Sequence, residues 1–304
     1  GEGGGGDRGR GGVWDHGWVE GVEFAAGDGG ATGPGGAPDN RSAALAARGW
    51  IWVMDLQTRE ARRVTKTSAV DARPAWSPDG KQIAFVRDDS RDTSIVLLDL
   101  ASGREKVLVD SPALDLDPSY SADGRTVYYS SAEAGDLDLW SVDLGSGAKK
   151  RLTSERGQEM MPQPFDAGIF YLAKVSGSSD TIQILNFKDD SKRIVRDEGI
   201  ASQMRPALSK DGKNYAVNIP FQDRWQLWLA DFRGQPPIQI AAYARYPQMP
   251  TWSADGAYVY YAEPAADERF HIYRVKTTGG EAENVSPISW NWGEPTSRVI
   301  IKTR

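Results

Sequence analysis

Acidic residues recur at a fixed spacing in this chain of 304 residues, and they are its first candidates for chemistry. Asp71, Asp115 and Glu159 follow one another at steps of 44 residues. Three carboxylates on adjacent repeats could hold a hard cation such as calcium, which prefers oxygen ligands. Hydrated loop acids explain the same residues more simply, so we predict no metal and no other cofactor.

The sequence offers few groups for hydrolysis. Metal-dependent hydrolysis of amides needs several histidines and a carboxylate to hold the metal and activate water. The chain has two histidines, His16 and His271, and we assign both to packing or surface positions. It also lacks the Gly-x-Ser-x-Gly motif that presents a nucleophilic serine. We therefore predict no catalytic residues and no enzymatic activity.

Two sequence markers place the acids on a repeating unit. Proline recurs at a step of 44 residues, at Pro74, Pro118, Pro162, Pro206 and Pro250. A second marker keeps the same step, at Trp52, Val96, Trp140, Ile184, Trp228 and Ile272. A fixed period of this size indicates an array of supersecondary units.

Each unit has the pattern of four short strands separated by turns. Most units carry Asp-Gly at the first hairpin, because glycine tolerates the positive φ of such turns: 79–80, 123–124, 211–212 and 255–256. The fourth unit has Ala167-Gly168 instead, which predicts a loosened hairpin. Aspartates that end the third strands are expected to set a second turn: Asp55, Asp99, Asp143 and Asp231. Four antiparallel strands per period form one propeller blade.

The units add up to an all-β, six-bladed β-propeller of four-stranded antiparallel blades. Five units are complete, and residues 50–65 supply the third and fourth strands of another. Residues 290–304 have the pattern of its first two strands. We predict that residues 296–302 pair with the strand at 50–56, which closes the ring and removes its open edges. The predicted domains are an N-terminal arm, residues 1–45, and the propeller, residues 46–304.

The residue before each repeat proline leads into the innermost strand, at the mouth of the central channel. These residues are Arg73, Asp117, Met161, Arg205, Met249 and, in the closing blade, Glu294. Because they include both signs of charge and two methionines, they form no uniform ion ring. The channel mouth is nevertheless a better candidate for function than the histidines.

The N-terminal arm has its own pattern. Residues 1–12 are a glycine-rich charged tail, residues 27–40 a linker, and residues 41–49 a short lead-in with a brief helical turn. Residues 13–26 carry an apolar stripe on one face of an extended strand: Trp14, His16, Trp18, Val22 and Phe24. We predict that this strand inserts into a neighbouring subunit and builds filaments. The alternative is that it folds back over its own ring.

Composition limits the partners and the compartment. A net charge of −6 and a pI of about 5.2 argue against nucleic acid as the main partner. No stretch has the roughly 18 apolar residues of a membrane-spanning helix. There is no cysteine, so the redox compartment cannot be inferred. The chain starts at Gly1, and we expect an exported protein, periplasmic or extracellular, whose leader has been removed.

The run Pro-Ala-Trp-Ser-Pro-Asp-Gly at 74–80 and its counterpart at 118–124 resemble TolB-like propeller repeats, and the resemblance covers roughly residues 50–304. Residues 115–130 and the run Trp-Gly-Glu-Pro-Thr at 292–296 are similar to the propeller that precedes the catalytic domain of some secreted amidohydrolases. The resemblance would place the start of such a domain near Arg304. It implies either a protein-docking ring or a gate attached to a hydrolase.

Two functions follow from these patterns. The first is a non-catalytic structural or interaction subunit that binds protein, including other copies of itself through the arm. The second is an accessory module of an amidohydrolase-type hydrolase that binds substrate or partner without its own catalytic domain. The aromatic stripe favours the first function, and the resemblance at 115–130 favours the second.

Overall fold

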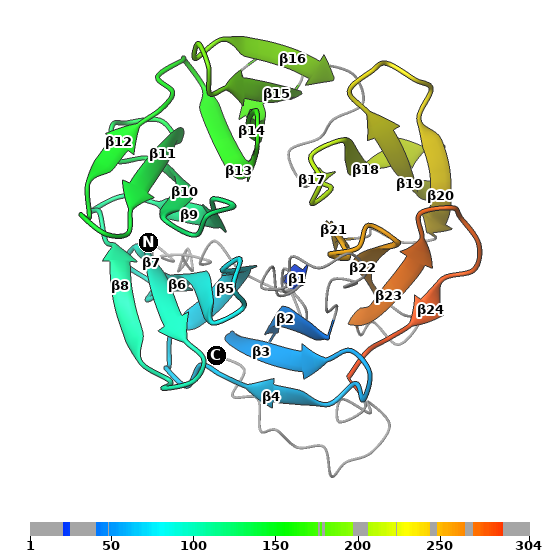
Figure 1. Ribbon diagram of the computed structural model, residues 1–304, viewed down its shortest axis with the longest axis horizontal. Coiled ribbons are helices and arrows are strands. Elements are labelled where there is room, and N and C mark those ends of the chain that lie inside the picture. The colour runs from blue at the N-terminus through cyan, green and yellow to red at the C-terminus, as the bar shows by residue number, and fades with distance from the viewer. Residues whose placement is uncertain are drawn as a thin grey trace, which may run out of the picture.

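The chain folds into a ring of six antiparallel sheets around a central axis (Figure 1). The computed structural model describes residues 21–24, 41–47, 49–175, 177, 180–196, 206–222, 224–243, 248–264 and 270–287. Within these ranges the regular elements are strands, with no helix, and each sheet has four strands. The predicted all-β, six-bladed propeller is therefore confirmed.

The strands run outward from the axis in chain order within each blade. Blades one to three contain β1 (Gly21–Phe24), β2 (Ser42–Ala47), β3 (Trp50–Asp55) and β4 (Ala61–Arg63); β5 (Val70–Trp76), β6 (Gln82–Asp88), β7 (Thr93–Asp99) and β8 (Glu105–Val109); and β9 (Asp115–Tyr120), β10 (Thr126–Ser131), β11 (Asp138–Asp143) and β12 (Lys149–Arg151). Blades four to six contain β13 (Gln158–Phe165), β14 (Gly168–Lys174), β15 (Thr181–Asn186) and β16 (Lys192–Arg196); β17 (Ala207–Leu208), β18 (Asn214–Phe221), β19 (Arg224–Asp231) and β20 (Ile238–Tyr243); and β21 (Gln248–Trp252), β22 (Tyr258–Pro264), β23 (Phe270–Lys276) and β24 (Glu283–Asn284).

One hydrogen-bond pattern fixes the first hairpin of four blades. In blade two, the Ser77 hydroxyl donates to Asp79 Oδ1 at 2.7 Å and accepts the Gln82 amide at 2.9 Å. Gly80 takes a φ of +70°, which a side chain would disfavour. Ser121, Ser209 and Ser253 make the same two bonds in their own hairpins. The Asp-Gly pairs thus mark turns, as predicted.

The aspartates that end the third strands also set turns. Asp99 Oδ1 accepts the amide and the hydroxyl of Ser102 at 2.8 and 2.6 Å, and these bonds hold the pKa of Asp99 below its usual range. Asp143 does the same with Ser146. Asp55 and Asp231 accept turn amides in the equivalent places. The turn-setting role predicted for all four is confirmed.

The predicted loosening of the fourth hairpin is wrong. Pro164 and Ile169 enclose a four-residue turn in blade four, whereas Trp76 and Ile83, at the equivalent positions of blade two, enclose a six-residue turn. The close approach depends on glycine. A Cβ on Gly168 would lie 2.1 Å from the Leu185 carbonyl oxygen of β15. The missing Asp-Gly pair therefore signals a shorter hairpin.

Apolar side chains fill the interface between each pair of neighbouring blades, which we call a seam. Each of the six seams has a buried cluster that draws residues from both of its blades. The seam between blades one and six joins Leu45, Trp52 and Met54 to Tyr260 and Ile272. The core is thus distributed around the ring, and it closes the ring between the first and last blades.

The predicted closure of the ring by C-terminal strands is wrong. β3 pairs with β2 on one edge and with β4 on the other, so no edge remains for residues 296–302. Those residues themselves lie outside the described ranges. The first blade is instead completed from the N-terminal side, by β2 and by β1, which pairs with β2. The predicted domain boundary between residues 45 and 46 falls inside β2, and the lead-in is strand rather than helical turn.

Candidate functional site on the innermost strands

The innermost strands carry the same bulge at the repeat proline. In blade two, Ala72 pairs with Val86 and Ala75 with Ala84, so Arg73 and Pro74 together face Phe85. Residues 117–118, 161–162 and 249–250 lie in the same two-against-one arrangement. The residues they face are large and buried: Phe85, Tyr129, Tyr171 and Tyr261. A bulge interrupts the regular alternation of side chains along its strand, so it changes the direction in which the residues at the bulge point.

The bulges contain a disfavoured backbone conformation. Arg73, Asp117 and Met161 have φ angles of 52°, 55° and 58°. Left-handed φ is uncommon for residues other than glycine, and a following proline restricts the residue before it toward extended conformations. Such strain costs on the order of 1–3 kcal/mol per residue and persists only where the surrounding structure enforces it. Here the buried ring opposite each bulge and the seams enforce it.

A polar chain links the bulges of three adjacent blades. The Arg73 guanidinium of β5 donates to Asp117 of β9 in an ion pair, in which the Asp117 side chain is 4% exposed. The other Asp117 oxygen lies 3.3 Å from the Met161 amide of β13. Ser130 Oγ is 3.2 Å from the same amide. Three predicted channel-mouth residues are therefore brought together, whereas Ser130 had no marker in the sequence.

The remaining predicted site residues have varied outcomes. Arg205 and Glu294 lie outside the described residues, and so do Trp14, His16 and Trp18. Met249 belongs to the bulge of β21, and only its backbone is described. Val22 and Phe24 lie in β1, which pairs with β2 of the same chain, and insertion of the arm into a neighbour stays a prediction. His271 of β23 has Nδ1 within 3.2 Å of the Asn284 amide, as a packed rim residue would.

The three candidate cation ligands each have local partners. Arg87 holds both oxygens of Asp71, at 2.8 and 3.1 Å. Asp115 accepts the Ser131 hydroxyl at 2.6 Å and the Ser111 amide at 2.8 Å. Burial raises the pKa of each of these two carboxyls. Among the described residues no group of three potential ligands lies close enough to hold a metal ion.

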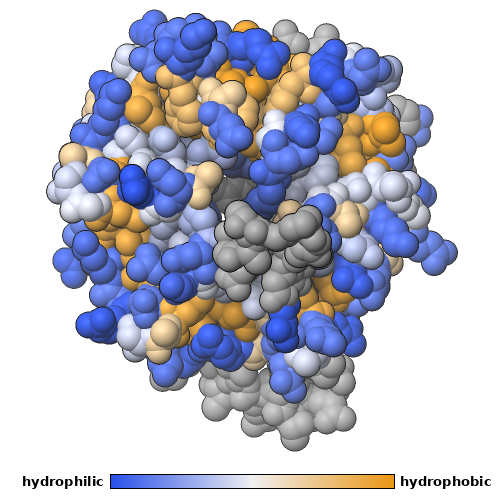
Figure 2. Space-filling model, viewed as in Figure 1, coloured by the Kyte–Doolittle hydropathy of each residue, from blue (hydrophilic) through white to orange (hydrophobic). Residues whose placement is uncertain are grey.

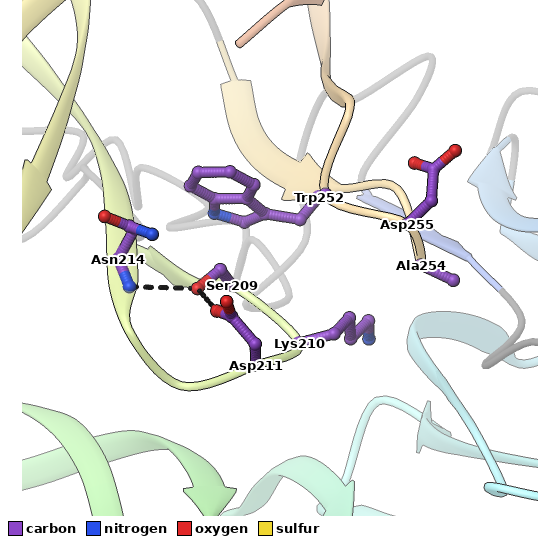
Figure 3. Close-up of a pocket in the computed structure, with 8 residues that line it drawn as sticks. Ser209, Lys210, Asp211, Asn214, Trp252, Ala254 and Asp255 are labelled. Carbon is purple, nitrogen blue, oxygen red and sulfur yellow. Dashed lines mark hydrogen bonds between the residues drawn. The ribbon is translucent and has the colours of Figure 1, made fainter. Parts of the chain in front are cut away.

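A small cleft of about 180 Å³ lies between the first hairpins of blades five and six (Figure 3). Ser209, Lys210 and Asp211 border it on one side, and Trp252 and Asp255 on the other. The Trp252 indole is 4% exposed and donates to the Ala207 carbonyl at 2.9 Å. Ser209 and Asp211 are bonded to each other, as in the other hairpins. The cleft therefore lies between two turns of ordinary construction, and its groups already have partners.

The outer surface is mainly polar. Hydrophilic residues cover most of the described surface on the face shown in Figure 2, with hydrophobic patches between them. No helix that could cross a membrane is found in the described part of the chain.

Comparisons with known proteins agree with this geometry. Residues 46–201, just over half of the chain, match the family described as PD40, TolB beta propeller domain. The Tol-Pal system protein TolB of Mannheimia succiniciproducens is 46% identical over 44 residues, which are 14% of this chain and 10% of that protein.

Solved structures show the same fold. TolB from Acinetobacter baumannii superposes with a TM-score of 0.64 at 22% identity, covering 79% of this chain and 61% of that one. A prolyl endopeptidase superposes with a TM-score of 0.55 at 15% identity, covering 82% of this chain and 40% of that one. This chain thus spans less than two thirds of the length of either structure. By its repeats, its blades and its family match, the chain belongs to the family of TolB β-propeller domains.

Proposed function

We propose that this propeller is a non-catalytic subunit that binds another protein through its innermost strands. The observation that carries the proposal is the contrast between a constant backbone and a varied side chain. The bulge recurs in blade after blade, yet its leading residue is Arg73, then Asp117, then Met161. A fold that repeats the same backbone bulge but changes the side chain at its leading position is suited to specific recognition of a partner.

The charges at this site suit a binding surface. Arg73 and Asp117 neutralise each other, and Asp117 also orders the Met161 amide. A partner with its own charged and amide groups can exchange for these bonds without leaving a buried charge unpaired. The proposal assigns these groups no catalytic role, because Asp117 is already bonded to Arg73 and to the Met161 amide.

The name of one relative supports a protein partner. The Mannheimia relative is named as part of the Tol-Pal system, which points to a protein assembly. We also propose that this chain works in a periplasmic or extracellular compartment. The net charge of −6 fits a protein partner better than nucleic acid.

The second candidate is an accessory propeller of a hydrolase. It is favoured by the fold shared with a prolyl endopeptidase, in which this chain matches only 40% of the length. In that case the innermost strands would receive substrate or a catalytic domain. The two functions differ in what binds, and they predict the same surface.

Self-association through the arm remains a separate proposal for residues 13–20. The stripe of Trp14 and Trp18 motivates it, because removing large apolar side chains from water lowers the free energy. Because β1 already completes blade one, an inserting arm would either use the residues before it or exchange β1 between subunits.

The test compares partner capture by variants of the full chain. The unchanged protein, Arg73→Ala and the outer-strand control Lys106→Ala are immobilised and exposed to envelope proteins from the source cells. Capture of one defined protein that is lost in Arg73→Ala and kept in the control supports the proposal. Equal capture by all three contradicts it. Turnover of amide or ester substrates with zinc or manganese, lost on a single acidic or histidine substitution, would contradict the absence of catalysis.

A further inference from the structure

The strand that holds Met161 also carries an acid with an unusual environment. Glu159 is 3% exposed and occupies the repeat position of Asp71 and Asp115. Its amide donates to the Leu137 carbonyl of blade three at 2.7 Å, a bond that crosses the seam between blades three and four. Its carboxyl is thereby placed beside Asp138, the first residue of β11, which is fully buried.

The short hairpin of blade four removes the partner that this position has elsewhere. In blades two and three, the residues paired with the acid are donors, Arg87 for Asp71 and Ser131 for Asp115. In blade four, the hairpin is tighter, and the residue paired with Glu159 is Ala173. Alanine has no side-chain donor, so the Glu159 carboxyl must find its hydrogen bond across the seam.

The group it finds is another carboxyl. The Asp138 carboxyl and the Thr153 hydroxyl both lie close enough to the Glu159 carboxyl to act on its pKa. Asp138 Oδ2 accepts Arg151 Nη2 at 2.8 Å, whereas Asp138 Oδ1 and Glu159 Oε2 are buried with no donor. A carboxylate only accepts hydrogen bonds, so two neighbouring buried carboxyls whose oxygens lack a donor are stabilised by a proton between them.

The equivalent positions in blade one show that the arrangement is particular to this seam. Trp50 and Arg63 stand at the repeat positions of Asp138 and Arg151, and the Arg63 guanidinium lies over the Trp50 ring at 4.4 Å. That pair has no acid to titrate. Blade three replaces the indole with a carboxylate, and this carboxylate meets Glu159.

We propose that Asp138 and Glu159 share one proton across the seam between blades three and four, and that loss of this proton loosens the seam. The charged and titratable groups that face the pair are Arg151, Lys192, Asp136 and Tyr171. With the proton in place, the pair carries one negative charge, which Arg151 balances. Without it, two buried carboxylates face one guanidinium, and like charges in a buried site repel strongly.

The direction of the pH dependence follows from the two states of Glu159. Burial, and then the Asp138 carboxyl, raise the pKa of Glu159 to about 7, against the opposing Thr153 hydroxyl. In an opened seam the same group titrates at about 4.3. The closed seam therefore holds a proton that the open seam releases, and its stability is greatest at acid pH and is lost as pH rises to about 7. Met161 follows Glu159 by two residues in β13, so loosening of this seam would also affect the innermost-strand site.

The test is hydrogen exchange of peptides covering residues 157–175, corrected for the intrinsic effect of pH. In the unchanged protein we expect protection to fall by up to about tenfold per pH unit between pH 5 and 7 and then to level off. Glu159→Gln keeps the shape and lacks the titration, so its protection should be independent of pH. Glu283→Gln, a surface glutamate paired with Arg274 in blade six, should behave as the unchanged protein does.

Two further measurements keep the proposal open to refutation. Ala173→Ser restores the donor found at Ser131, and it should move the loss of protection to lower pH. Carbon-13 NMR of glutamate carboxyls in the unchanged protein should show one group that titrates near pH 7 and is missing in Glu159→Gln. Titration of every glutamate near its ordinary value overturns the proposal, as does an equal pH slope in Glu159→Gln. If that variant does not fold, the NMR titration decides alone.

Discussion

Arg73 of blade two forms an ion pair with Asp117 of blade three, the residue at its own repeat position 44 residues later. Asp117 in turn accepts the amide of Met161, again 44 residues later. Equivalent positions of successive repeats thus bind one another around the axis. The contact depends on the bulges, because those of blades two, three and four hold Arg73, Asp117 and Met161 at a positive φ.

Replacing Asp117 by alanine should destabilise the ring by about 3 kcal/mol. Removing one partner of a buried ion pair costs about 3–5 kcal/mol, and the partial exposure of Arg73 reduces this figure. The free energy of unfolding in urea measures the loss. Asp110→Ala, at an exposed acid between β8 and β9, is the control and should change little. A loss below 1 kcal/mol in Asp117→Ala would show that the chain of bonds is not structural.

Replacing Gly168 by alanine should destabilise blade four by about 3 kcal/mol or more, since overpacking without room to relax is costly. The added methyl would lie 2.1 Å from the Leu185 carbonyl oxygen, in the interior of a sheet. Gly145→Ala is the matched control, because its nearest neighbour, Asp143 Oδ1, lies at 3.4 Å. Thermal unfolding followed by circular dichroism compares the two. Equal melting temperatures would contradict the close packing described for this hairpin.

Two deletions separate the roles of the N-terminal residues. Removal of residues 1–24 takes away β1 and leaves the edge of β2 open, so we expect aggregation or a large loss of melting temperature. Removal of residues 1–20 keeps β1, and the ring should melt as before. Native mass spectrometry of the shorter deletion then tests self-association through residues 13–20. An assembly that persists without these residues contradicts that proposal.

Calcium should leave the stability of the ring unchanged. Asp71 is held by Arg87, and Asp115 by Ser131 and Ser111, so neither carboxylate is available to a cation without losing its present bonds. Melting temperatures with millimolar calcium and with EDTA should agree within error. A stabilisation by calcium that is absent in Asp115→Asn would restore the metal-site interpretation, since ligands that bind the folded state raise its stability.

The period of the prolines and the Asp-Gly turns predicts the fold because each marks a backbone requirement that every blade shares. The second strand escaped prediction for the opposite reason, whereas the first was predicted as a strand but not as part of blade one. β2 reads Ser-Ala-Ala-Leu-Ala-Ala, with neither repeat marker nor β-branched residue, and its alanines favour helix in isolation. In the ring, residues 43–47 are completely buried between neighbouring blades, where small side chains fit. Tertiary packing decided this element.

The candidate site, like the fold, can be predicted only in part from the sequence. The positions of Arg73, Asp117 and Met161 follow from the repeat, so the sequence predicts that they lie at one level of the ring. Their mutual contact follows from the left-handed φ of the residue before each proline. No residue type at that position indicates such a φ, so the sequence does not predict the contact. The meeting of Asp138 with Glu159 follows from a hairpin two residues shorter, which changes the residue opposite Glu159 from a donor to Ala173. Such shifts of register are visible only in the structure.

Among the strands that the structure describes, none of the first sheet pairs with one of the last, and each described blade is a contiguous length of chain. The joint between the first and last blades is a seam of side chains like the other five. Duplication or loss of one whole repeat would therefore need no new way to close the ring, because all six seams are built from side chains in the same way. A ring of this construction can therefore gain or lose one whole blade at a time, because each blade contacts its two neighbours through side-chain seams.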